Sequence, residues 1–291
     1  MDIGVWDVLA VIVKAALYAA TFAAAGGAFF LCYTGSILED GERRKIGRRI
    51  EMCVAAAVAA SALRIAVTAG SMTGDASGMI DSKLIHMVWR SGEDSAVIMR
   101  IAGLLLAVRA AMPARPSMAL AALGGVCAAT SFAWVGHAHA TGSFWTQASV
   151  ALHLAGVAFW MGALWPLSVL ARDGDPRRAG RAAERFGAGA VAAVGILVIA
   201  GLFVLSRFLG HASALWSSPY GAAMCLKLAF VAALLSLAAI NKLKLTPRLK
   251  AGDLAAAPSL RRTIHAEMAL AALILLTTAA ITTLIGPPAL G

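Results

Sequence analysis

Long apolar runs constrain this chain more than any other feature of its sequence. Runs of roughly 18 or more apolar residues are typical of membrane-spanning helices, because about 20 helical residues cross the hydrocarbon of a bilayer. The 291 residues are 60% hydrophobic and 14% charged, whereas soluble domains carry about 25% charged residues. We therefore expect an all-α, polytopic membrane helix bundle that forms one transmembrane domain over residues 1–291. The expected spans are 6–35, 49–70, 94–111, 117–136, 144–170, 186–207, 219–241 and 263–285.

Basic residues gather in alternate connections between these eight runs. The connections 37–49, 112–117, 172–185 and 241–262, with their margins, hold 18 Lys and Arg residues. The other connections hold Lys83 and Arg90, with Arg207 at their margin. Because Lys and Arg concentrate in cytoplasmic loops, the pattern predicts that both termini are periplasmic. The net charge of +10 then belongs to loops beside a lipid bilayer, and we expect no nucleic acid as a partner.

Three local features refine this layout. The first run follows Met1–Asp7 without a basic region or a small-residue cleavage site, so we expect a retained helix and no signal peptide. Arg100 lies in the third run, where we expect it to snorkel outward or to pair with Glu93 or Asp94. The preceding segment 79–90 mixes apolar and charged residues, which indicates an interfacial or re-entrant helix.

Five of the six histidines lie on the predicted outer side. They are His86 in the long outer connection, His137 and His139 in GHAHA, His211 in LGHAS, and His153 about eight residues inside the fifth run. Imidazole suits copper, zinc, iron and nickel, and a thioether favours Cu(I). The nearby methionines are Met72, Met79, Met87 and Met161. Histidines and methionines facing an oxidising compartment predict a copper ion, Cu(I) or Cu(II). The alternatives are a solvated histidine loop and methionines that only pack.

His153 is the one histidine predicted to lie deep within a span. In helical register it shares a face with Gly156, Val157 and Trp160, with Met161 beside it. An ionisable group at that depth usually faces a bundle interior or a polar cavity. His153 is therefore either a metal ligand reached from the outer mouth or a neutral histidine bonded to a neighbouring helix.

The same stretch carries a family resemblance. LHLAGVAFWMGALWPL, preceded by GHAHA and followed by an Arg-rich turn with Arg-Phe, resembles the copper resistance D (CopD) family of bacterial inner-membrane proteins. SPYGAAMCLKLAF, AAINKLKLTPRL and the stretch from HAEMAL to ITTLIGPP are similar to further parts of it. The resemblance covers about residues 130–288, and the first 110 residues match only in hydrophobic layout. Gly187 departs from the pattern, because Ser is expected there.

The resemblance implies copper handling at the inner membrane. The family is described as moving copper from periplasm to cytoplasm beside a periplasmic copper-binding protein. Carried over to this chain, the outer Gly-His histidine is His137, the helix histidine is His153 and the intramembrane lysine is Lys227. The aromatic-Gly pair falls on Trp160 and Gly162.

Three further residues are candidates for a copper path. Lys227 lies about eight residues into the seventh run, where a charged amine needs an acceptor or water. We expect a water-lined cavity or backbone carbonyls there, with Glu267 too far away. Cys32 and Cys53 lie at matching cytoplasmic depth, which predicts a Cu(I) exit site. The alternative is that they are small buried hydrophobic residues, and no disulfide framework is expected.

The residues leave three functions open. The first is a copper transporter or channel, and the second is a membrane haem protein of electron transfer with histidine axial ligands. The third is a copper-binding scaffold that does not transport. Because the sequence has no phosphate-binding glycine-rich loop and no catalytic triad, we do not expect an enzyme.

Overall fold

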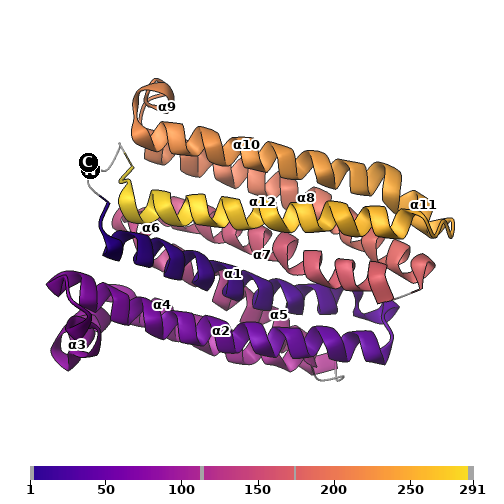
Figure 1. Ribbon diagram of the computed structural model, residues 1–291, viewed down its shortest axis with the longest axis horizontal. Coiled ribbons are helices and arrows are strands. Elements are labelled where there is room, and N and C mark those ends of the chain that lie inside the picture. Colours follow the sequence, from indigo (N-terminus) through magenta and orange to yellow (C-terminus); the bar gives the residue numbers. More distant parts are fainter. Residues whose placement is uncertain (1–2, 112–114, 174, 288–291) are drawn as a thin grey trace.

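The computed structural model describes residues 3–111, 115–173 and 175–287, and these residues form helices and no strand. Long helices lie side by side, and short ones cap the ends of the bundle (Figure 1). The predicted all-α bundle is thereby confirmed. The long helices are α1 (Val5–Thr34), α2 (Asp40–Thr73), α4 (Asp94–Ala107), α5 (Arg115–Thr130), α7 (Phe144–Asp173), α8 (Pro176–Leu209), α10 (Pro219–Ile240) and α12 (Ala256–Leu284). The short ones are α3 (Ser82–Val88), α6 (His137–Ala140), α9 (Ala214–Ser217) and α11 (Thr246–Lys250).

Within the described residues, seven helical segments are long and apolar enough to cross a membrane. They are Val5–Ile37, Asp40–Thr73, Ser117–Trp134, Phe144–Asp173, Pro176–Leu209, Pro219–Lys250 and Ala256–Leu284. Each overlaps one predicted span, so the chain is a multi-pass membrane protein. The remaining predicted span, 94–111, is helical as α4 and the turn Val108–Ala111, but it carries Asp94, Arg100 and Arg109. A count of eight spans and the orientation of the termini therefore stay predictions.

The helices extend beyond the apolar runs because polar residues cap them. Asp175 precedes α8 and accepts hydrogen bonds from the backbone N–H groups of Arg177 and Arg178, with Pro176 at the first position. Ser218 does the same for α10, accepting from the backbone N–H of Gly221. These caps satisfy backbone donors that a helix start leaves open. Helix α8 therefore begins at Pro176, in the polar connection before the predicted span 186–207, whereas α10 begins at Pro219, as predicted.

Helix α1 lies at the centre, in contact with α2, α5, α7 and α12. Its crossing with α7 is tight: a Cβ at Gly26 would lie 1.8 Å from the carbonyl oxygen of Ala158, and one at Gly162 would lie 2.0 Å from the carbonyl carbon of Gly26. Small residues allow such close helix packing in membranes. By contrast, the most apolar window is 50% buried in α7 but 11% in α8 and 6% in α10. Helices α8 and α10 thus form the lipid-facing edge.

The side chain of Arg100, in the third predicted span, does not extend to the membrane surface. Its side chain is 1% exposed, and its Nε donates to Ser131 Oγ at 3.0 Å. The guanidinium carbon lies 4.0 Å from the ring centroid of Phe132. Snorkelling was therefore wrong, because the side chain turns into the bundle, where a hydroxyl and an aromatic face contact it. The alternative, pairing with Glu93 or Asp94, stays a prediction. The preceding segment is helical, and the π-helical turn Trp89–Glu93 joins α3 to α4.

The two ends of the bundle hold different connections (Figure 1). Helices α3, α6 and α9 lie at one end, together with the start of α1 and the end of α12. The α1–α2 and α7–α8 connections and α11 lie at the other end, where the basic loops of the sequence fall. There, a hydrogen bond from Arg248 lowers the pKa of Asp253, so this loop carboxylate stays ionised at neutral pH.

Candidate functional site: a polar seam along α7

His153 is held against α8 inside the bundle. Its Nδ1 lies 3.2 Å from the carbonyl oxygen of Leu197. A Cβ at Gly201 would lie 3.3 Å from the imidazole Cε1, so the absence of a side chain there makes room for the ring. Gly156 similarly admits the Leu197 side chain, which would lie 2.9 Å from a Cβ at that position. Two glycines on facing helices thus let α7 and α8 enclose the imidazole.

Lys227 of α10 is the charged neighbour of His153. The two side chains are close enough to act on each other electrostatically. This agrees with the matching depth expected from their positions, since α10 begins at Pro219 and α7 at Phe144 on the same end of the bundle. The lysine side chain is half-buried. Lys227 and His153 therefore lie at similar depth and interact electrostatically.

Deeper in the bundle, the carboxyl group of Glu267 on α12 is 3% exposed. It accepts a hydrogen bond from the side-chain amide of Asn241, whose oxygen accepts from the hydroxyl of Thr263. Asn241 begins the π-helical turn Asn241–Leu245 that follows α10, and such turns often occur at functional positions. The indole of Trp160 on α7 also lies within interaction range of this carboxyl group. Its N–H is buried and makes no hydrogen bond within the described residues.

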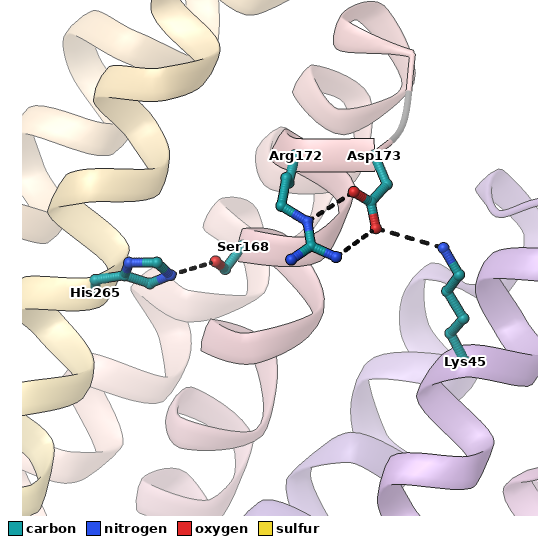
Figure 2. A network of polar contacts seen from close by, with 5 residues as sticks. All are labelled: Lys45, Ser168, Arg172, Asp173 and His265. Atoms are coloured by element: carbon teal, nitrogen blue, oxygen red, sulfur yellow. Dashed lines mark hydrogen bonds and ion pairs between the residues drawn. The ribbon is translucent and has the colours of Figure 1, made fainter.

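A second polar contact lies nearer the end of the bundle that holds the basic loops. Ser168 of α7 and His265 of α12 share a hydrogen bond of 2.9 Å (Figure 2). Nearby, Asp173 accepts from Arg172 and from Lys45 of α2 at 3.4 Å, as Figure 2 also shows. The His265–Ser168 contact joins α12 to α7, and Asp173 joins α7 to α2.

These groups lie in register on α7. His153, Trp160 and Ser168 are seven and eight residues apart, which places them on one face of the helix. Their partners come from α8, α10 with its π-turn, and α12. We call the set formed by His153, Lys227, Trp160, Asn241, Thr263, Glu267, Ser168 and His265 the polar seam. Along α7 it extends from His153 to Ser168, a separation of fifteen positions, or about 22 Å at the rise of an α-helix.

The outer histidines sit on turns at the other end. Gly136 precedes His137 and Gly210 precedes His211, with φ of 68° and 72°, a backbone conformation that favours glycine. Nδ1 of His139 shares a 2.9 Å hydrogen bond with the side-chain amide of Gln147. His139 and His211 are exposed, and the side chain of His137 lies outside the described residues.

His86 lies apart from His211. Helix α3, which carries His86, lies at the opposite edge of the bundle from α9, which follows His211, with α6 between them (Figure 1). His86 is exposed as well. Among the described residues, no three His, Cys, Asp or Glu side chains are grouped as a metal site. The convergence of His137, His139 and His211 stays a prediction.

The remaining candidates occupy separate places. Met79 packs on Gly70 of α2, where a Cβ would lie 2.7 Å from its Cγ. Met161 is partly buried against the core helices. Cys32 donates its thiol hydrogen to the Met118 carbonyl oxygen at 3.0 Å, whereas Cys53 is buried beside Arg49. No hydrogen bond joins the two thiols in the described part of the chain, and their role as an exit site stays a prediction.

Sequence reasoning missed the pairing of Glu267 with Asn241. Both residues lie in stretches that carry the family resemblance, but their side chains are 26 positions apart. The sequence did indicate an acidic residue in one predicted span, Glu267, and an amide residue at the end of the preceding span, Asn241. Sequence alone did not reveal that a π-helical turn aims Asn241 at α12.

Comparison with known families agrees with this architecture. The model described as "Copper resistance protein D" matches residues 180–281, which include α10, most of α12 and the Asn241–Glu267 pair. The model described as "Copper resistance protein D-like, N-terminal domain" matches residues 5–146, so the likeness extends into the half where only hydrophobic layout was expected. No curated protein and no solved structure gives a significant match. Together the two models cover most of the chain, and it belongs to the copper resistance protein D family.

Proposed function

We propose that this copper resistance protein moves copper ions through the bacterial inner membrane, from the periplasm toward the cytoplasm. Membership of the family supports a role in copper resistance. The multi-pass bundle supports a membrane location. The path begins at the outer histidines and methionines, passes His153, and follows the polar seam toward the end that holds the basic loops. A periplasmic copper-binding protein delivers the ion, and Cys32 and Cys53 take part in its exit.

The hydrogen bond of His153 is the observation that carries this proposal. A carbonyl oxygen only accepts, so the Nδ1 that bonds to Leu197 must carry the proton. In a neutral imidazole the lone pair is then on Nε2. Metal-binding histidines are commonly oriented in this way, with one ring nitrogen donating to a carbonyl and the other free to bind the ion. His153 is thus prepared to ligate copper through Nε2.

Lys227 bears on the form in which copper passes. A protonated amine close to His153 repels a bare cation. Copper that carries an anionic ligand, or that arrives as the amine loses its proton, avoids this repulsion. The ion therefore passes this point with its charge compensated.

Flux through His153→Gln tests the proposal. Glutamine keeps a polar hydrogen-bonding group but ligates copper poorly, so we expect copper uptake into proteoliposomes to fall at least tenfold. Binding also falls as the pH drops through the pKa of the histidine, since protonated imidazole does not bind metal. Uptake is measured by metal analysis of vesicles after external copper is removed.

The control is Ser206→Ala on α8, outside the polar seam. Its hydroxyl is exposed and bonds only to a backbone carbonyl of its own helix, so the variant should retain most of the uptake. Equal uptake by the His153→Gln variant and the unmodified chain would refute the assignment. Copper binding without uptake by the unmodified chain would indicate a scaffold, and a haem Soret band in the purified protein would indicate electron transfer.

A further inference from the structure

One carboxyl group inside the polar seam has no cation to balance it. The side chain of Glu267 is 3% exposed and belongs to α12, a candidate membrane span. The side chains that act on its carboxyl group are those of Asn241 and Trp160, and neither carries a charge. Among the described residues, no Lys, Arg or His forms an ion pair with it. Because burying an uncompensated charge is costly, the carboxyl group is neutral and carries a proton.

The ionisable side chains nearest to Glu267 along the chain are directed elsewhere. His265 of α12 bonds to Ser168 of α7 (Figure 2), and Lys242 of the π-helical turn donates to the Gly187 carbonyl oxygen of α8. The other ionisable residues of α12 and of the elements packed against it are Asp7, Lys14, Tyr18, Cys32, Tyr33, His153, Arg172, Asp173, Tyr220, Cys225, Lys227, Lys244, Arg248, Lys250, Arg261 and Arg262. None of these is among the groups that act on the Glu267 carboxyl.

The hydrogen bonds around Glu267 suit both of its protonation states. As a carboxylate it accepts from the amide of Asn241, whose oxygen accepts from the hydroxyl of Thr263. With the amide group turned over, a protonated acid donates to the amide oxygen, and the amide nitrogen donates to Thr263 Oγ1. The Thr263 hydroxyl then donates to the Leu260 carbonyl oxygen, 2.8 Å away. A change of protonation therefore needs one amide to turn and leaves every group with a partner.

Trp160 connects this acid to the copper path. It lies seven positions after His153 on the same face of α7, or about 10 Å along the helix. Its indole N–H is buried and makes no hydrogen bond within the described residues. An indole N–H only donates, and an ionised carboxylate is a stronger acceptor than the neutral acid. A copper ion that has passed His153 brings the positive charge that an ionised Glu267 lacks.

We propose that Glu267 holds a proton in the copper-free bundle and releases it when copper enters this part of the polar seam, so that copper is exchanged for a proton. The inference rests on the proposed function, because it takes copper as the ion that passes. When copper enters, the O–H bond of the acid breaks, the electron pair stays on the carboxylate and the proton passes to water. When copper leaves, the carboxylate takes a proton from water again.

Infrared difference spectra of the purified full-length protein, with and without copper, test this exchange. Near neutral pH, the copper-free protein should show the carbonyl band of a protonated carboxylic acid, and copper should replace it by carboxylate bands. Glu267→Gln should lack both changes and keep its Tm, because an amide resembles the neutral acid in shape and hydrogen bonding. Glu184→Gln makes the same change in an exposed acid of α8 and should retain both.

The pH dependence of copper binding is the second measurement. A proton that leaves as copper binds makes the affinity rise with pH for as long as the copper-free protein holds that proton. The copper affinity of the unmodified chain should therefore rise by up to about tenfold more per pH unit than that of Glu267→Gln, which has no proton to release there.

Carbon-13 labelling of the glutamate carboxyl groups keeps the test independent of how any variant folds, because the band of Glu267 must then shift to lower frequency. The proposal is overturned if the copper-free protein lacks the band, if the band survives copper binding, or if Glu267→Gln retains it. Copper uptake in any of these cases leaves the proposed function standing. An unmodified chain that neither binds nor takes up copper overturns the proposed function and the exchange together.

Discussion

Two interior polar residues of this protein are held by partners on other elements. His153 bonds to a backbone carbonyl of α8, and Glu267 accepts from the side chain of Asn241 beyond α10. Such partners are needed because a buried polar group without a hydrogen bond loses the free energy of its hydration. The polar seam therefore contributes to the stability of the bundle as well as to any path through it.

Replacing Asn241 tests this role. The variant Asn241→Ala leaves the Glu267 carboxyl group without its donor, which should cost about 1–3 kcal/mol of unfolding free energy. We expect the Tm of the purified protein in detergent to fall by several degrees. Ser236→Ala is the control, because that hydroxyl is exposed on the same helix and bonds only to its own backbone.

A double variant separates the hydrogen bond from general damage. Asn241→Leu combined with Glu267→Met removes both polar partners, so part of the lost stability should return. If Asn241→Ala unfolds at the same temperature as the unmodified chain, Glu267 has another partner or water in solution.

At the level of whole helices, the crossing of α1 and α7 tolerates the least change. There, the backbones of Gly26 and Gly162 leave no room for a side chain. Gly162→Ala should therefore lower the yield of folded, monodisperse protein strongly. Gly195→Ala in α8 is the matched control, because nothing lies within 4 Å of a Cβ there. It should be neutral or stabilise the helix by up to about 1 kcal/mol, and size-exclusion profiles and Tm values compare the two variants. Equal behaviour of both would show that the helices are farther apart than 1.8–2.0 Å contacts imply.

The turn at α6 bears on copper capture. Replacing His137 and His139 together by Ala should lower the copper stoichiometry or affinity of the purified protein, because two imidazoles at the outer end are lost. Metal analysis after equilibrium dialysis measures both quantities. Ser236→Ala, which changes an exposed hydroxyl outside the polar seam, provides the comparison. Unchanged binding in the double variant would mean that the HAH pair is only a solvated loop.

At the scale of the whole molecule, the structure bears on topology. The start of α1 and the end of α12 lie at one end of the bundle (Figure 1), which agrees with an even number of crossings. Helix α4 is the element that decides the number, because its segment carries three charged residues. The inward position of Arg100 removes one of these charges, the one in the middle of the segment, from lipid contact.

Reporter fusions test this topology. Alkaline phosphatase fused after Gly291 or inserted near Gly142 should be active, because both sites are predicted to be periplasmic and the enzyme matures only there. An insertion at Gly252, among the basic loops, should be inactive. Inactivity of the Gly291 fusion would overturn the count of eight spans.

The sequence by itself determined the helices and the family. A span must satisfy its own backbone hydrogen bonds and expose apolar side chains to lipid, so its length and composition are visible locally. The family resemblance of the C-terminal half is also visible locally, because its motifs are short runs of consecutive residues. The caps at Asp175 and Ser218 were equally local. The apolar run alone placed the start of α8 too late, at 186 instead of 176, but placed the start of α10 correctly at 219.

Only the tertiary structure decided which polar residues meet. Asn241 and Glu267 are 26 positions apart, and Lys14 and Thr282 are 268 apart. Arg100 was expected at the interface, but packing against Ser131 and Phe132 drew it inward. Helix rotation and crossing set such contacts, and they depend on small residues such as Gly26 and Gly162 on facing helices. In a bilayer, an apolar side chain is about equally stable against lipid and against another helix. Hydrophobicity therefore does not specify how each helix is rotated, and close packing of small residues does.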